Sequence, residues 1–226
     1  MIIEICAGWL KDCPTIGKLN YDNIVGNDVY SFEYDESWLV KNAFYLGPDI
    51  NEYLGRQYTN NKYMFGFLQD CCPDRWGRML IERNESIIAN KENRRTKYLS
   101  EADYLLSIND ETRTGGLRFK VNGKFVANNP ENNIPPYTTL RQLQDASLNI
   151  EKDENILNEK WIKELLVSGT SLGGARPKAS VIDENGEYWI GKFPSNKDEY
   201  DVGAFERVAN ELAKMCDIDV PESRLE

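Results

Sequence analysis

The sequence has 226 residues, of which 41% are hydrophobic and 28% charged, and this composition is typical of a globular protein with one large domain or two small ones. No apolar run approaches the ~18 residues that a membrane span needs, and the first residues lack the features of a secretion signal, so we expect a cytoplasmic protein without membrane contact. The net charge of −10 opposes electrostatic attraction to phosphate backbones, so we expect no direct nucleic acid binding.

The first 126 residues are predicted to form a small α+β subdomain. Aromatic residues alternate over residues 29–34, which is the period of a strand with one buried face. Apolar residues at helical spacing follow a proline and predict a helix over about residues 73–89. Ser100 followed by Asp103 resembles a capping box and predicts the start of a short helix.

A segment rich in turn formers separates this subdomain from a second one. We assign residues 127–150 to a linker and connecting segment and residues 151–226 to the second unit. Its pattern predicts a helix over residues 156–166, a hairpin over residues 179–193 with an Asn-Gly tip, and an amphipathic helix over residues 202–216. The predicted fold class is therefore α+β, with an antiparallel sheet and one packed helix in the second unit.

A glycine-rich loop joins the first helix of this unit to the hairpin. Three glycines and three hydroxyl residues lie between Ser168 and Gly174, and glycine lets backbone N–H groups approach phosphate oxygens closely. A flexible helix-to-strand connector would have the same composition, so the loop alone leaves both interpretations open. The loop is not a Walker A motif, because Ala175 stands where the lysine is required.

The order of the elements favours a nucleotide role over a connector. After the loop and hairpin, Lys192 lies at the end of a strand, and Glu206 lies beside the apolar stripe of the last helix. Kinase N-lobes place a lysine on the α- and β-phosphates and hold it with a helix carboxylate in this order. Each residue alone is more typical of a solvated surface charge, but their joint placement after the loop indicates a pair.

The motifs resemble those of the HipA family of serine/threonine kinases, the toxins of type II toxin–antitoxin systems. The similar segments are S-L-G-G-A-R-P-K at 171–178, W-I-G-K-F-P at 189–194, V-P-E-S at 220–223, P-D-R-W-G-R at 73–78 and T-G-G-L-R-F at 114–119. The resemblance covers nearly the whole chain in the right order. It implies that residues 151–226 are a kinase N-lobe portion with the glycine-rich loop, the hairpin and a lysine-positioning helix.

The resemblance also implies site residues and a cofactor, which is ATP with Mg²⁺. The residues that it implies for phosphate binding are Gly173, Gly174, Ala175, Arg176, Pro177, Lys178 and Lys192. Glu206 would position the lysine. Ser171 matches the serine that family kinases autophosphorylate, with Thr170 and Ser168 as alternative acceptors.

The resemblance implies a partner and a substrate as well, namely a HipB-like helix-turn-helix antitoxin and a protein of the translation apparatus. Family members continue into a helical C-lobe with the catalytic and metal-binding carboxylates, and we expect that C-lobe to be absent here. We assign no catalytic residue and no metal ligand to this chain. The absence of histidine excludes His-dependent triads and His-ligated metals, and we expect the Mg²⁺ ligands in the missing C-lobe.

We therefore expect a kinase portion that is inactive alone. The alternatives are a non-catalytic protein-interaction module or a half-kinase subunit that needs a partner. An independent nucleotide hydrolase is disfavoured by the lack of a Walker A motif and a general base.

Two further motifs are expected to have structural roles and not to bind a ligand. Trp76 is expected to pack in the core of the first subdomain, while Asp74, Arg75 and Arg78 make local ion pairs. The pair Gly115-Gly116 is expected to form a tight turn. The predicted site itself has two testable features: a mobile loop over residues 169–178 whose amides face a shallow groove shared with Lys192, and a contact between Lys192 and Glu206.

Overall fold

The computed structural model describes residues 1–41, 44–59, 64–110, 112–126, 136, 139–152 and 159–226. The strands are β1 (Ile2–Ala7), β2 (Thr15–Ile24), β3 (Asn27–Tyr34), β4 (Gln57–Tyr58), β5 (Leu117–Val121), β6 (Lys124–Phe125), β7 (Lys178–Ile182) and β8 (Tyr188–Lys192). The helices are α1 (Glu36–Lys41), α2 (Gly66–Gln69), α3 (Arg75–Lys91), α4 (Glu101–Leu106), α5 (Leu140–Lys152), α6 (Glu159–Gly169) and α7 (Val202–Met215).

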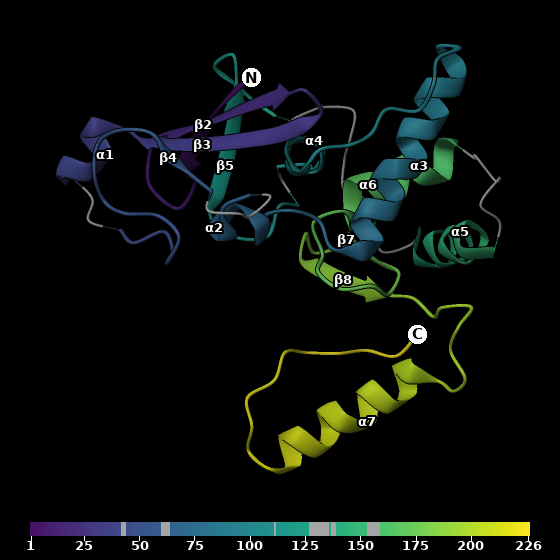
Figure 1. Cartoon of the computed structure of the whole chain (residues 1–226). Helices are drawn as coiled ribbons and strands as arrows, with labels where there is room; N and C mark the ends of the chain where they lie inside the picture. Colours follow the sequence, from purple (N-terminus) through teal and green to yellow (C-terminus); the bar gives the residue numbers. More distant parts are fainter. Residues whose placement is uncertain (42–43, 60–63, 111, 127–135, 137–138, 153–158) are drawn as a thin grey trace.

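A six-stranded antiparallel sheet forms one side of the molecule, in the order β4-β3-β2-β1-β5-β6 (Figure 1). The predicted alternation on β3 is confirmed, because Tyr30, Phe32 and Tyr34 are all buried. They join a core of apolar side chains from β1, β2, α1, α2 and α4. The predicted capping box is confirmed too: Asp103 N donates to Ser100 Oγ at 3.2 Å, and Ser100 N donates to Asp103 Oδ2 at 2.9 Å.

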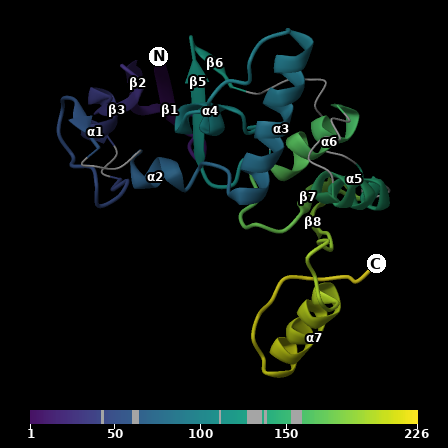
Figure 2. The ribbon, with the colours of Figure 1, turned by 45° about the vertical axis from the view of Figure 1, so that its right-hand side comes forward.

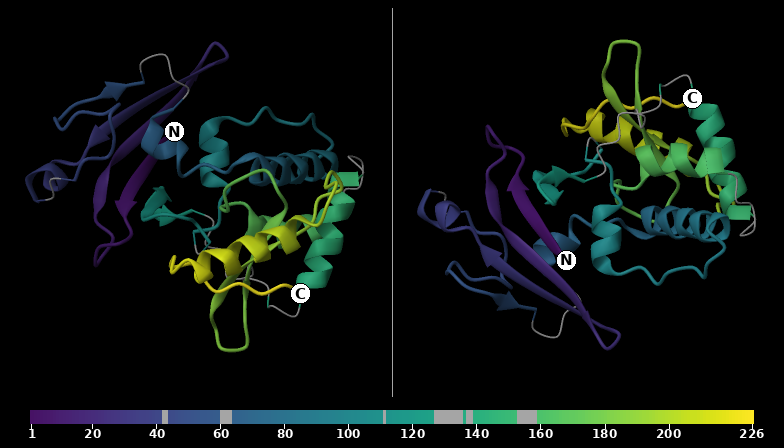
Figure 3. Two further views of the ribbon diagram at one scale, coloured as in Figure 1. Left: turned by 90° about the horizontal axis from the view of Figure 1, so that it is seen from below. Right: turned by 90° about the horizontal axis from the view of Figure 1, so that it is seen from above.

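A second core lies beside the sheet and is built around helix α3. In Figure 3 the purple strands of the sheet lie on one side, and the blue-to-green helices pack together on the other. The second core contains side chains from α3, α5, α6, β7 and the residue after β8, namely Trp76, Leu80, Ile87, Leu143, Ala146, Ile150, Ile162, Leu165, Ala179, Val181 and Phe193. Our expectation that Trp76 packs in the core of the first subdomain was wrong, because the indole lies in this second core.

Helix α5 was not predicted. Part of the predicted linker, residues 127–135 and 137–138, lies outside the described residues, as do residues 153–158 at the start of the predicted helix 156–166. The later part of the linker forms α5, whose Leu143, Ala146 and Ile150 are buried at helical spacing. That apolar spacing was the signal that the sequence analysis overlooked.

The C-terminal hairpin and helix form as predicted, but the helix packs differently. Strands β7 and β8 pair antiparallel, and Gly186 in the turn has a φ of 83°. We expected α7 to pack on this hairpin. Instead none of its residues is buried, and Figure 2 shows it standing apart from the body of the molecule. The hairpin packs on α3, α5 and α6 through Ala179 and Val181.

Among the described residues, none of the helices combines the length and the apolar character that crossing a membrane requires.

Candidate functional site

The glycine-rich loop connects α6 to β7, and its two ends come close together. A Cβ added at Gly169 would lie 2.7 Å from the Lys178 carbonyl oxygen, so only glycine fits there. Between these ends, Leu172 and Pro177 are buried and anchor the loop. The tip, residues 173–175, is exposed, so its backbone is accessible from solvent.

The N-terminal end of α3 holds this loop through three hydrogen bonds. Gly174 N donates to Asp74 Oδ2 at 2.6 Å, and Trp76 N donates to the Gly174 carbonyl oxygen at 3.4 Å. The Trp76 indole Nε1 donates to the Lys178 carbonyl oxygen at 3.1 Å. The motif at 73–78 therefore binds the glycine-rich loop to α3, a role that was not predicted from the sequence.

Two lysines face the same side of the hairpin beside the loop. Lys178 and Lys192 are directly opposite each other in the β7–β8 register, and opposite residues of an antiparallel pair lie on one face. Burial lowers the pKa of Lys178 from its ordinary value, and the positive charges of Lys192 and Arg176 lower it further. The carboxylates of Asp74 and Glu206 oppose this effect, so the site combines concentrated positive charge with two balancing anions.

The predicted contact between Lys192 and Glu206 is confirmed. The Lys192 ammonium forms an ion pair with Glu206 Oε1, and about half of each side chain is exposed. An exposed pair of this kind contributes only ~0–1 kcal/mol to stability. Glu206 also borders a hollow of about 580 Å³ whose other lining residues are Tyr200, Val202 and Phe205.

Of the other predicted phosphate-binding residues, Lys178 points to the loop and Arg176 points away from it. The Lys178 ammonium donates to the Gly173 carbonyl oxygen, which keeps it at the loop. Arg176 instead turns toward Asp198, with 2.5 Å between Nη2 and Oδ2. The pKa of Asp198 is lowered by the Ser195 backbone N–H and by Arg176. The structure therefore gathers the loop glycines, both lysines and Glu206, while Arg176 already has a carboxylate partner.

Of the three candidate acceptor hydroxyls, only Ser171 is partly exposed. Ser168 and Thr170 are 0% exposed, and each donates to a carbonyl one turn earlier in α6. Ser171 Oγ accepts from Thr114 N at 2.5 Å and lies 3.1 Å from Thr114 Oγ1. Thr114 belongs to the turn that contains Gly115, with a φ of 87°, so this predicted turn also fixes the start of the loop.

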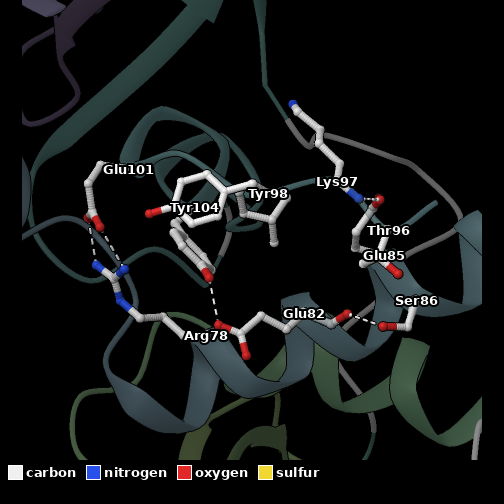
Figure 4. A pocket seen from close by; sticks show the side chains of 10 residues that line it. Arg78, Glu82, Glu85, Ser86, Thr96, Lys97, Tyr98, Glu101 and Tyr104 are labelled. Carbon is white, nitrogen blue, oxygen red and sulfur yellow. Dashed lines mark hydrogen bonds and ion pairs between the residues drawn. The ribbon is translucent and has the colours of Figure 1, made fainter. Parts of the chain in front are cut away.

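A separate polar groove of about 430 Å³ runs between α3 and the segment before α4 (Figure 4). Arg78 forms two hydrogen bonds with Glu101, at 2.8 and 2.6 Å, and the Tyr104 hydroxyl donates to Glu82 at 2.6 Å. These contacts join α3 to α4. Arg78 thus forms an ion pair as expected, but its partner lies 23 residues away and is not local. In the part of the chain that the structure describes, no group of three or more potential metal ligands occurs.

Two family models match the chain, one on each side of the linker. The HipA N-terminal domain matches residues 9–102, and the HipA-like C-terminal domain matches residues 170–226. No curated protein and no solved structure matches. The second match covers the loop, the hairpin and α7, so both HipA-type domains are represented in the chain. We had described the same region as a kinase N-lobe portion with the C-lobe absent, and the match does not support that absence. The chain belongs to the HipA-like family.

Proposed function

We propose that this chain binds the phosphates of ATP with the loop tip, Lys178 and Lys192, as part of a HipA-like serine/threonine kinase. The observation that carries the proposal is the placement of two lysines on one hairpin face beside an exposed glycine-rich tip. Positive charge and unhindered backbone N–H groups together are what a polyphosphate requires.

The residues present fit an anionic ligand. The Gly174 N–H already donates to a carboxylate oxygen, so its direction suits an oxyanion. Lys192 is half exposed, and Lys178 lies directly opposite it on the same face of the hairpin. One phosphate chain that approached this face would therefore meet both ammonium groups. Glu206 would keep Lys192 extended toward that chain. ATP supplies the phosphoryl group, and Mg²⁺ would offset charge on its phosphates.

Phosphoryl transfer also needs a carboxylate that orients the acceptor hydroxyl and carboxylates that hold the metal. We assign neither to this chain, and on that ground we expect no phosphoryl transfer by the chain alone. Ser171 is the proposed autophosphorylation site, because Ser168 and Thr170 are buried. Intact mass after incubation with ATP and Mg²⁺ tests both statements. Mass gain by the chain alone, mapped to Ser171, would contradict the expected inactivity.

Family membership supports proposals for the partners too. HipA-family toxins pair with HipB antitoxins, so we propose a HipB-like helix-turn-helix partner and a protein substrate of the translation apparatus. The net charge of −10 agrees with nucleic acid contact through that partner and not through this chain. We place the protein in the cytoplasm, where both partners would occur.

Calorimetric titration with ATP tests the binding proposal. Wild-type protein should bind ATP, and Lys192→Met should bind at least tenfold more weakly because one phosphate contact is lost. Lys18→Met is the matched control: Lys18 is an exposed strand lysine in the other sheet, and its replacement should leave the affinity unchanged.

A second candidate function is supported by the apolar face of α7. Phe205, Val208, Leu212 and Met215 are each more than half exposed, which is unusual for an amphipathic helix in a monomer. Such a face suits a half-kinase subunit or a non-catalytic interaction module that docks on a partner. Absence of ATP binding by the chain, with α7 bound to a partner or not, would favour the interaction module.

A further inference from the structure

Asp74 occupies the helix-capping position of α3 but does not cap the helix with its side chain. An aspartate at this position ordinarily accepts a hydrogen bond from an N–H in the first turn of its own helix. No such bond forms here, although the Asp74 carbonyl oxygen accepts normally from Arg78 N at 2.9 Å. The carboxylate instead accepts from Gly174 N, 100 residues away, at 2.6 Å. Its function therefore lies in the loop and not in the helix.

The Asp74 carboxylate faces the groups that we assign to phosphate binding. Its Oδ2 atom would lie 3.3 Å from a Cβ added at Gly173, so it approaches both glycines of the loop tip. It also interacts electrostatically with Lys178, on the same side as Lys192. A carboxylate oxygen and a phosphate oxygen are the same kind of anionic acceptor, so both cannot accept from the Gly174 N–H at once.

We propose that Asp74 is an internal competitor of phosphate, which holds the loop on α3 until a nucleotide displaces it from the Gly174 N–H. This inference rests on the proposed function and adds a regulatory contact to it. Displacement also affects the neighbouring bond from Trp76 N to the Gly174 carbonyl oxygen, because both bonds involve one residue of the loop. Nucleotide binding and release of the loop from α3 are thus coupled.

Replacing Asp74 with asparagine tests the competition with little effect on the helix, because the two residues are equally good at a helix N-cap. The variant loses the negative charge, so its side chain competes less well with phosphate. We expect Asp74→Asn to bind ATP and inorganic triphosphate about tenfold more tightly than wild type, which corresponds to ~1.4 kcal/mol. Adenosine affinity should not change, because adenosine carries no phosphate.

The matched control is Asp70→Asn, which removes the same charge from an exposed position at the C-terminal end of α2. It separates local competition from the general effect of net charge on anion binding. A second readout needs no nucleotide: hydrogen exchange of the Gly174 amide should be faster in Asp74→Asn than in wild type and unchanged in Asp70→Asn.

The outcomes separate this inference from the proposed function. Tighter triphosphate binding in Asp74→Asn alone supports the competition. Equal or weaker binding in that variant, with binding by wild type intact, overturns it and leaves the proposed function standing, since the carboxylate would then only shape the loop. Absence of ATP and triphosphate binding in all three proteins overturns both.

Discussion

Replacing Gly77 with alanine tests how closely α3 packs against the start of the glycine-rich loop. Gly77 is buried in the first turn of α3, and a Cβ there would lie 2.5 Å from the Thr170 carbonyl oxygen and 2.8 Å from Pro73 Cβ. Both neighbours belong to backbone or a rigid ring, so neither moves easily. Alanine in a helix gains at most ~1 kcal/mol over glycine, whereas overpacking costs ~1–3 kcal/mol. Because an approach of 2.5 Å is far inside contact distance, the overpacking cost should be ~2–3 kcal/mol, and we expect a net loss of roughly 1–2 kcal/mol in the free energy of unfolding.

Urea denaturation followed by circular dichroism measures this loss. Gly203→Ala in α7 is the matched control, because the nearest atom to its added Cβ is Asp201 Oδ1 at 3.4 Å, an ordinary contact. That variant should be neutral or slightly stabilised. If Gly77→Ala were as stable as wild type or more stable, the close approach of α3 to the Thr170 carbonyl would be refuted.

Three other predictions concern the Arg94–Glu85 ion pair, the Asp110–Arg113 ion pair and the loop. Hydrogen bonds from Arg94 lower the pKa of Glu85 to about 2. The stability that Glu85 adds is therefore present above about pH 4.5 and is lost as the pH falls toward 2. Glu85→Gln should be less sensitive to acid over this range, and an acid-unfolding profile identical to that of wild type would contradict this. Asp110→Ala would leave the 0%-exposed Arg113 guanidinium without its carboxylate and should cost ~3–5 kcal/mol in urea denaturation, while a cost under ~1 kcal/mol would argue against burial of the pair. Ser171→Asp adds a charge where the hydroxyl meets the turn before β5, so a protease of broad specificity such as proteinase K should cut the loop faster than in Ser171→Ala. Equal rates would count against that contact.

Local features of the fold were predictable because each depends on residues close together in the sequence. The alternating aromatics of β3, the capping box at Ser100 and the β7–β8 hairpin are all of this kind. The contact between Lys192 and Glu206 was predictable for a related reason, because the order of strand and helix brings the two residues to one end of the hairpin.

Long-range packing was not predictable from the same patterns. The apolar stripe of α3 identifies its buried face but not the partner that covers it, so Trp76 was placed in the wrong core. The Asp74 contact with Gly174 joins segments 100 residues apart, and no local pattern reports it. Amphipathicity likewise predicted α7 correctly as a helix but suggested a buried face, which the structure leaves exposed.

The most direct test of phosphate binding at this site is to follow the backbone amides of the loop tip during titration with ATP. In nitrogen-15 labelled protein, the amide signals of Gly173, Gly174 and Ala175 should shift with increasing ATP, and Lys192→Met should show much smaller shifts at the same concentrations. If these three amides stayed unchanged while ATP was in excess, or if Lys192→Met responded as wild type does, the assignment of this loop and lysine to nucleotide phosphates would be contradicted.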